Sequence, residues 1–241
     1  IPLDSKGSNV TLANLPVNLI DRVEIYKGVV PASLGTDALG GAVNIITLAE
    51  KKNFMDASYS IGSFHTHRAD LNAQFVEQCT GLIVRPTIGI NYSKNDYRMK
   101  DVQMRNETGD QFIYGNPKRF HDGYFSLLAQ IETGITGKLW ADEFFVSASY
   151  SKTDKELQTG SVQTKVYGMA ERNSDAWNVS ARYNKHNFIT EGMTLKATLS
   201  HTWDHSITID TAYRKYYWDG GYIVSQRNEI RGNEPSIRHL S

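Results

Sequence analysis

The stretch from Ile20 to Thr47 reads IDRVEIYKGVVPASLGTDALGGAVNIIT. Val23 and Ile25 alternate with polar residues, which predicts a half-buried strand that ends at Lys27. The apolar run 43–46 predicts a second short, buried strand. Between the two, Pro31 excludes a central place in a sheet, and glycines supply the freedom that tight turns require. On its residues alone, the stretch is also compatible with a plain β-turn-β unit.

The order of residues in this stretch resembles the end of the plug domain of TonB-dependent outer-membrane receptors. The resemblance rests on the charged pair Arg22 and Glu24, on the apolar run around Asn44, and on the plug-turn glycines Gly28, Gly35, Gly40 and Gly41. It implies that residues 1–48 are the C-terminal part of a plug domain. Residues 49–241 would then be the N-terminal strands and extracellular loops of an outer-membrane β-barrel.

Seven segments after the stretch alternate between apolar and polar residues with a period of two, as strands do. Each is about 8 to 12 residues long, close to the roughly 9–11 residues that carry a tilted strand across a bilayer. Soluble strands average about 5–6 residues. We therefore predict membrane strands over residues 55–62, 68–75, 82–93, 125–132, 144–151, 177–184 and 193–203.

Charged residues inside these segments all fall on the polar face. An Arg or Lys on the lipid face would cost roughly 2–4 kcal/mol at mid-membrane, so this bias is expected of a barrel with a wet lumen. Aromatic residues occur near the segment ends, where an interfacial girdle would place them: Phe75, Tyr92, Tyr150, Tyr183 and Trp203. A soluble β-sandwich, which also alternates, remains the alternative.

Connections between the segments alternate in length. Short turns are expected near residues 79–81, 136–138 and 190–192, and long polar connections over 94–122 and 152–174. Short periplasmic turns with long outer loops are the outer-membrane pattern. The fold class is therefore all-β, and the resemblance makes it part of a plugged, antiparallel transmembrane barrel of about 22 strands. About seven of those strands are expected here, with the signal peptide, TonB box, first plug half and remaining barrel outside this chain.

Composition limits the other classes of function. The formal net charge is 0, so no bulk attraction to nucleic acid is implied. A single cysteine, Cys79, excludes a disulfide framework. The pair His65 and His67 lacks a third ligand nearby in sequence, and His201 and His205 would lie about 13 Å apart along a strand. We expect no metal site, no cofactor and no enzyme activity.

The resemblance implies a gated importer in the outer membrane of a Gram-negative bacterium. TonB of the inner-membrane energy complex would be the protein partner, and outer-membrane lipid would surround the barrel. Arg22 and Glu24 would lie at the plug–barrel contact, with Glu132 on the lumen wall as the expected partner of Arg22.

The cargo implied first is a ferric siderophore, so iron would enter only as part of the transported chelate. Cobalamin, haem and glycans are the alternatives within the family. Arg and Tyr side chains suit an anionic or catecholate ferric complex. The expected ligand contacts in the outer loops are Tyr97, Arg98, Tyr114, Arg119, His121, Tyr216, Tyr217 and Trp218. A passive porin, a signalling receptor with an added N-terminal domain, and a soluble adhesion domain remain as alternatives.

Overall fold

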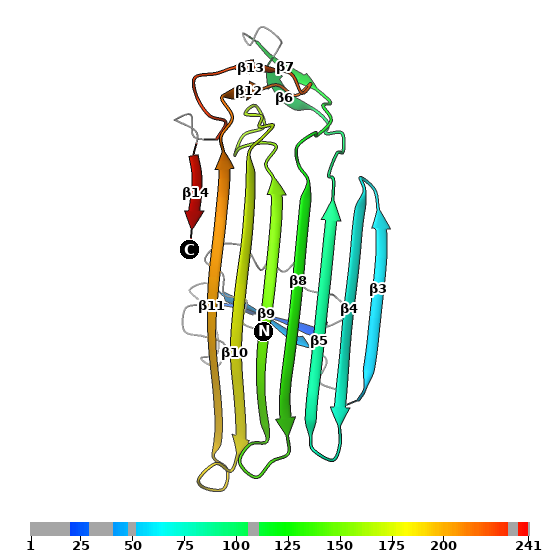
Figure 1. Ribbon diagram of the computed structural model, residues 1–241, viewed down its shortest axis with the longest axis vertical. Helices are drawn as coiled ribbons and strands as arrows, with labels where there is room; N and C mark the ends of the chain where they lie inside the picture. Colours follow the sequence, from blue (N-terminus) through cyan, green and yellow to red (C-terminus); the bar gives the residue numbers. More distant parts are fainter. Residues whose placement is uncertain (1–19, 29–40, 48–51, 106–110, 231–235, 241) are drawn as a thin grey trace.

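A computed structural model describes residues 20–28, 41–47, 52–105, 111–230 and 236–240. The described chain is all-β, and no helix in these ranges is long and apolar enough to cross a membrane. Eight strands form one sheet in which every neighbouring pair is antiparallel (Figure 1). Across the sheet they are β14 (Ser236–Leu240), β11 (Thr194–Asp210), β10 (Glu171–His186), β9 (Glu143–Glu156), β8 (Tyr124–Thr136), β5 (Leu82–Ser93), β4 (Thr66–Glu77) and β3 (Phe54–Gly62).

All seven segments predicted from the alternation are strands of this sheet, and β14 is an additional short one. From β4 onward the connections confirm the predicted alternation in length, with short turns at one end of the sheet and long connections at the other, where the short β3–β4 turn also lies (Figure 1). Both bounds of the loop expected over 152–174 were wrong. Because β9 continues to Glu156 and β10 begins at Glu171, the two ends of that segment are instead strand paired to its neighbours.

Three two-stranded sheets accompany the large one. The stretch from Ile20 to Thr47 includes β1 (Ile20–Lys27) and β2 (Gly41–Thr47), which pair with each other and lie behind the large sheet in Figure 1. The two strands predicted there are confirmed, but Val23 and Val43 are exposed rather than buried. The hairpins β6 (Val102–Arg105) with β7 (Phe112–Gly115), and β12 (Arg214–Tyr216) with β13 (Tyr222–Val224), lie at the long-loop end.

The register aligns side chains of one kind across the whole sheet. One row, from β3 to β11, reads Ala57, Leu71, Ile88, Ala129, Tyr150, Trp177 and Trp203. The adjacent row reads Asp56, Asn72, Thr87, Gln130, Ser149, Asn178 and Thr202. Since successive residues point to opposite faces, the sheet has one apolar face and one polar face.

Burial is inverted relative to a soluble sheet. On the apolar face, Ile131, Trp177 and Leu199 are 51%, 53% and 76% exposed. On the polar face, Gln74 and Ser126 are only 0% and 2% exposed. A monomeric soluble protein rarely leaves so large a contiguous apolar surface open to water, whereas a bilayer would cover it.

Aromatic residues of the apolar face form two belts. Near the short turns, the Trp140 ring lies 5.6 Å from Phe144 and 6.5 Å from Tyr183. Further up the strands, the ring centroids of Tyr150 and Trp177 are 4.8 Å apart, and Trp203 follows in the same row. The strands continue past this second belt, so Tyr150 and Trp203 lie within strands rather than at their ends.

The upper belt also indicates how the strands are inclined. Ile88 on β5 and Trp203 on β11 belong to the same row of paired residues and are four strands apart. Tyr92 lies four residues after Ile88 on β5, toward the long-loop end of the sheet. Four residues correspond to about 13 Å and four strand spacings to about 19 Å. A belt parallel to a membrane through these two aromatics therefore gives a strand tilt of roughly 35°, within the range of closed barrels.

Candidate functional site

Three connections pack together above the strands at the long-loop end and are called the cap. They comprise residues 94–123, 157–170 and 211–230, leaving out 106–110 (Figure 1). Their common core is formed by Val102, Val166, Tyr216 and Trp218, against which Met99 and Met104 pack. The Trp218 indole N–H donates to the Gln163 carbonyl at 2.9 Å. Each of the three connections contributes to this core, so the cap is one packed unit.

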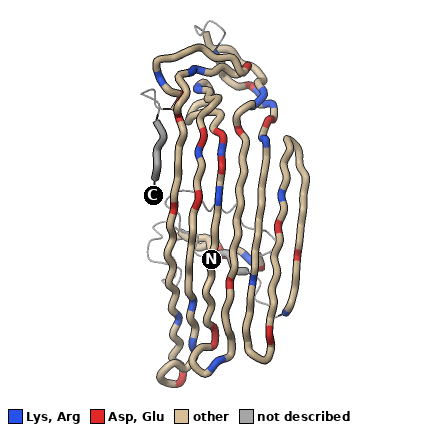
Figure 2. Tube along the Cα trace, in the orientation of Figure 1, with Lys and Arg blue, Asp and Glu red and all other residues tan. Residues whose placement is uncertain are grey.

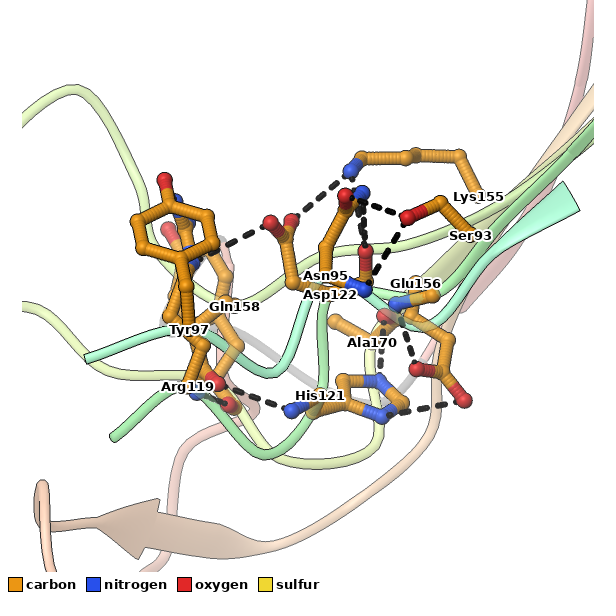
Figure 3. Close-up of polar contacts among 12 residues, drawn as sticks. Ser93, Asn95, Tyr97, Arg119, His121, Asp122, Lys155, Glu156, Gln158 and Ala170 are labelled. Carbon is orange, nitrogen blue, oxygen red and sulfur yellow. Dashed lines mark hydrogen bonds and ion pairs between the residues drawn. The ribbon is translucent and has the colours of Figure 1, made fainter. Parts of the chain in front are cut away.

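Gln158 ties the base of the cap together (Figure 3). Its Oε1 accepts hydrogen bonds from the backbone N–H groups of Phe120 and His121 at 2.7 and 2.8 Å, and its Nε2 donates to the Tyr167 carbonyl at 2.9 Å. His121 is buried, with Nε2 2.9 Å from the Ala170 carbonyl oxygen. These bonds join the first connection to the second and hold the His121 ring in one orientation.

A charged cluster around Asp122 lies beside this network (Figure 3). Lys155 Nζ is 2.7 Å from Asp122 Oδ1. Arg119 Nε lies 3.1 Å from Asp122 Oδ2, close enough for an ion pair but not aligned for a hydrogen bond. Arg119 also donates to the Tyr97 hydroxyl at 2.7 Å and lies over the Tyr97 ring. Two cations therefore share one buried carboxylate, and a second carboxylate, Glu156, accepts from the backbone N–H of Gly123, next to Asp122, at 2.7 Å.

Glu229 joins the third connection to the second. Its carboxylate accepts hydrogen bonds from the backbone N–H groups of Gly168 and Met169 at 2.9 and 3.1 Å. Asp210, at the end of β11, accepts from the backbone N–H groups of Glu229 and Ile230 at 2.9 and 3.2 Å. Burial raises the pKa of Glu229, and the nearby Asp210 charge adds to this, while the two backbone donors oppose it.

The expected ligand contacts have different positions in the cap. Tyr114 and Arg98 are exposed on its surface, and Arg98 donates to the Asn116 carbonyl at 3.0 Å. Tyr97, Arg119 and His121 belong to the networks at the base, as described above. The aromatic run at 216–218 is largely internal, because Tyr216 and Trp218 are 9% and 7% exposed and only Tyr217 is partly accessible. A direct contact with ligand stays a prediction for each of the eight.

Sequence reasoning missed Gln158, Asp122, Lys155, Asp210 and Glu229. These are the residues that connect one loop to another, through contacts 19 to 61 positions apart in the chain. The only sequence signal was that Asp122 directly follows His121. Their partners are set by how the loops pack, which no local pattern reports.

The charged pair expected at the plug–barrel contact has nearer partners in the structure. Arg22 lies 3.1 Å from Glu24 and 3.2 Å from Asp21. Glu24 also accepts from the Tyr26 hydroxyl at 2.9 Å and from Asn44 Nδ2 at 3.2 Å, which links β1 to β2. The Tyr26 hydrogen bond is the largest cause of the lowered pKa of Glu24, followed by Arg22 and Asn44.

Glu132 is bound within the polar face of the large sheet. Arg85 Nη1 lies 2.6 Å from its Oε1, and Arg182 Nη2 lies 3.4 Å from its Oε2. Both guanidinium groups also lie over the Phe145 ring, at 5.1 and 5.2 Å from its centroid. Two arginines share one glutamate here, so Arg22 would have to compete with them. The Arg22–Glu132 contact remains a prediction.

Two of the four plug-turn glycines can be placed. Gly41 has φ +148°, and a Cβ there would lie 2.5 Å from the Tyr26 carbonyl oxygen, so the close β1–β2 approach requires glycine. Gly28 has φ +84°, in the left-handed region that glycine favours. Gly35 and Gly40 lie outside the described residues.

Within the described ranges, no three His, Cys, Asp or Glu side chains are placed to hold a metal ion. His67, one member of the tight histidine pair, hydrogen-bonds through Nδ1 to the Tyr59 hydroxyl at 2.8 Å. What the site offers is a rigid cap with exposed polar and aromatic groups above a polar sheet face.

The chain is similar to a curated protein, the vitamin B12 transporter BtuB of Vibrio vulnificus (strain CMCP6). The two are 22% identical over 224 residues, covering 82% of this chain and 36% of the transporter. The chain thus spans about a third of the length of the curated relative it matches. No protein-family model matches the chain.

Proposed function

We propose that this chain is part of a TonB-dependent importer in the outer membrane of a Gram-negative bacterium. The observation that carries the proposal is the inverted large sheet, with its apolar rows exposed and its polar rows buried. A bilayer on one side and a wet, plugged lumen on the other would satisfy both faces. The similarity to a transporter over 82% of the chain supports the same conclusion.

In this proposal, the cap binds the cargo and the β1–β2 unit belongs to the plug. The cap is held by bonds between loops, such as Glu229 to Gly168 and Gln158 to His121, so its exposed side chains are presented on a stable frame. The β1–β2 unit shares no ladder hydrogen bond with the large sheet. It can therefore be displaced by a pull from TonB without breaking the barrel wall, and the barrel strands absent from this chain would close the wall.

Two cargoes are proposed. A ferric siderophore is favoured by the Arg and Tyr side chains at the cap, including Arg98 and Tyr114 on its surface and the cations Arg119 and Lys155 that flank Asp122. Cobalamin is the second candidate, and the similarity to a vitamin B12 transporter is the observation that favours it. Haem and glycans have no comparable support.

The first experiment tests the barrel. The full-length protein is extracted from outer membranes with detergent and run on gels with and without heating. A barrel polypeptide well above 27.1 kDa should change its mobility on heating, because folded barrels resist detergent until heated. A species of 27.1 kDa that stays in the aqueous phase on detergent partition, and whose gel mobility does not change on heating, would refute the proposal and favour the soluble β-sandwich.

The cargo is tested with the same preparation. Binding of cyanocobalamin and of ferric catecholate and hydroxamate chelates is followed by quenching of tryptophan fluorescence, and uptake is measured in cells with and without TonB. We expect uptake of one class only, abolished without TonB. Uptake that persists without TonB would instead indicate a passive channel.

A further inference from the structure

Basic side chains gather where β5 leaves the sheet toward the cap, visible as adjacent blue positions above that strand (Figure 2). Four belong to one surface, which we call the rim patch: His65, Lys94, Arg98 and Lys118. The carboxylate at its centre is Asp96. The patch is separate from the buried networks of the cap. Of its residues, only Arg98 was among the expected ligand contacts, and none belongs to the plug.

The patch carries more positive charge than its one central carboxylate neutralises. Lys118 Nζ lies 2.8 Å from Asp96 Oδ2 and Lys94 Nζ lies 3.9 Å from the same atom. Both lysine side chains are 58% exposed. The pKa of Asp96 is lowered, first by the Lys118 hydrogen bond and further by the charges of Lys94 and His65. Arg98 is also exposed, and its guanidinium donates to the neutral Asn116 carbonyl. The surplus positive charge therefore faces outward.

Directly below the patch lies the apolar face of β3, β4 and β5. Tyr59, His67 and Tyr92 are stacked side by side there, with ring centroids 6.3 Å apart in each neighbouring pair. Ile61 is exposed beside them. Lys94 follows Tyr92 by two residues, so it continues the lipid-facing side of β5 upward. Cations above an aromatic and apolar surface match an amphiphile that has an anionic head and hydrocarbon chains.

We propose that the rim patch binds the phosphorylated headgroup of an anionic lipid in the outer leaflet, whose acyl chains lie along Tyr59, Ile61 and Tyr92. The inference rests on the proposed function, since it requires the apolar face to contact the bilayer. Charge complementarity selects an anionic lipid over a neutral one. The continuity of the patch with the apolar face selects a lipid over a soluble phosphate, which would gain nothing from that face.

The test uses the full-length protein in detergent, titrated with diphosphorylated lipid A and followed by native mass spectrometry. The variant Lys94→Gln/Lys118→Gln removes two charges of the patch. The control Lys138→Gln/Lys196→Gln removes two lysines from the β8–β9 turn and from the start of β11, at the opposite end of the sheet from the patch. At about fivefold per lysine near a charged headgroup, the patch variant should bind lipid A roughly thirtyfold more weakly, and the control should bind as the parent does.

Several results would overturn the inference. The first is that the patch variant binds lipid A as tightly as the parent does, and the second is that the control variant loses as much affinity as the patch variant. The third is that the parent binds lipid A without phosphate groups as tightly as diphosphorylated lipid A. The fourth is that inorganic phosphate alone displaces lipid A at matched concentration. The last result would mean a site for free phosphate. The heat-dependent gel shift is measured on every variant. If the parent lacks that shift, the proposed function fails; if the shift persists while lipid binding is unaffected, only the lipid site fails.

Discussion

A single arginine placed on either face of β8 would separate a membrane wall from a soluble sheet. Ala129 and Gln130 are adjacent, both half-buried, and lie in the apolar and polar rows respectively. Ala129 pairs with Ile88 on one side and Tyr150 on the other, near the middle of the strand. Because alanine contributes little packing of its own, Ala129→Arg isolates the cost of placing a charge on that face.

The expected cost of Ala129→Arg is about 2–4 kcal/mol if the apolar face lies at mid-bilayer. That corresponds to a change of roughly 30- to 1,000-fold in the folding equilibrium, since about 1.4 kcal/mol is tenfold. Gln130→Arg, which faces the wet lumen in our proposal, should cost only a few tenths of a kcal/mol. An exposed surface of a soluble sheet would tolerate both changes within about 0.5 kcal/mol.

The assay is reversible unfolding of the full-length protein in phosphatidylcholine vesicles, with urea titration followed by tryptophan fluorescence. The two variants are compared with the parent at one lipid-to-protein ratio. Equal midpoints for Ala129→Arg and Gln130→Arg would refute the assignment of the apolar face to lipid. A larger loss for Gln130→Arg would mean that the two faces have been assigned the wrong way round.

Three further predictions concern the ends of the strands. The pKa of Asp142 is lowered to about 2, first by the His186 backbone N–H and then by the Lys185 and His186 side chains. A lowered carboxyl pKa stabilises the fold above the unfolded value and loses that effect as pH falls through the folded one. Thermal unfolding should therefore show Asp142→Asn less stable than the parent at pH 7, with the difference vanishing between about pH 4 and pH 2. Glu229→Ala leaves the N–H groups of Gly168 and Met169 without their acceptor, at roughly 1–3 kcal/mol each. Hydrogen exchange should accelerate at those two amides and stay unchanged at mid-strand amides. Unaltered exchange at 168 and 169 would contradict the role of Glu229 in joining the two connections. Gly81 has φ +72°, and a Cβ there would lie 2.4 Å from the Thr136 carbonyl oxygen. Gly81→Ala should lower the urea midpoint by more than Gly137→Ala, because at Gly137 a Cβ meets nothing.

The strands were predictable because their signal is local. A strand alternates its side chains with a period of two, so rows such as the one through Ile88 and Trp177 are already visible as alternation in single segments. The same alternation predicted which face carries charge, as Arg85 and Glu132 on the polar face show. Turn glycines such as Gly81 marked where the short connections lie.

The contacts of the cap were not predictable in the same way. The aromatic run at 216–218 was expected to face ligand because it is dense and lies in a loop. In the folded cap, Tyr216 and Trp218 pack against Val102 and Val166, which come from two other connections, and their contact with ligand stays a prediction. Likewise, Glu132 on β8 binds Arg85 on the neighbouring β5 and Arg182 on β10, which lies beyond β9, although the two arginines are 47 and 50 positions away in sequence.

The amino-acid sequence by itself determined the class of fold, which residues of each strand lie on the apolar and on the polar face, and the alternation of short and long connections. Each of these follows from the conformation of neighbouring residues. The tertiary structure alone decided how far each strand extends, which loop side chains are buried, and which charges are already paired. Those properties depend on segments far apart in the chain, whose approach is set by packing and pairing rather than by local sequence.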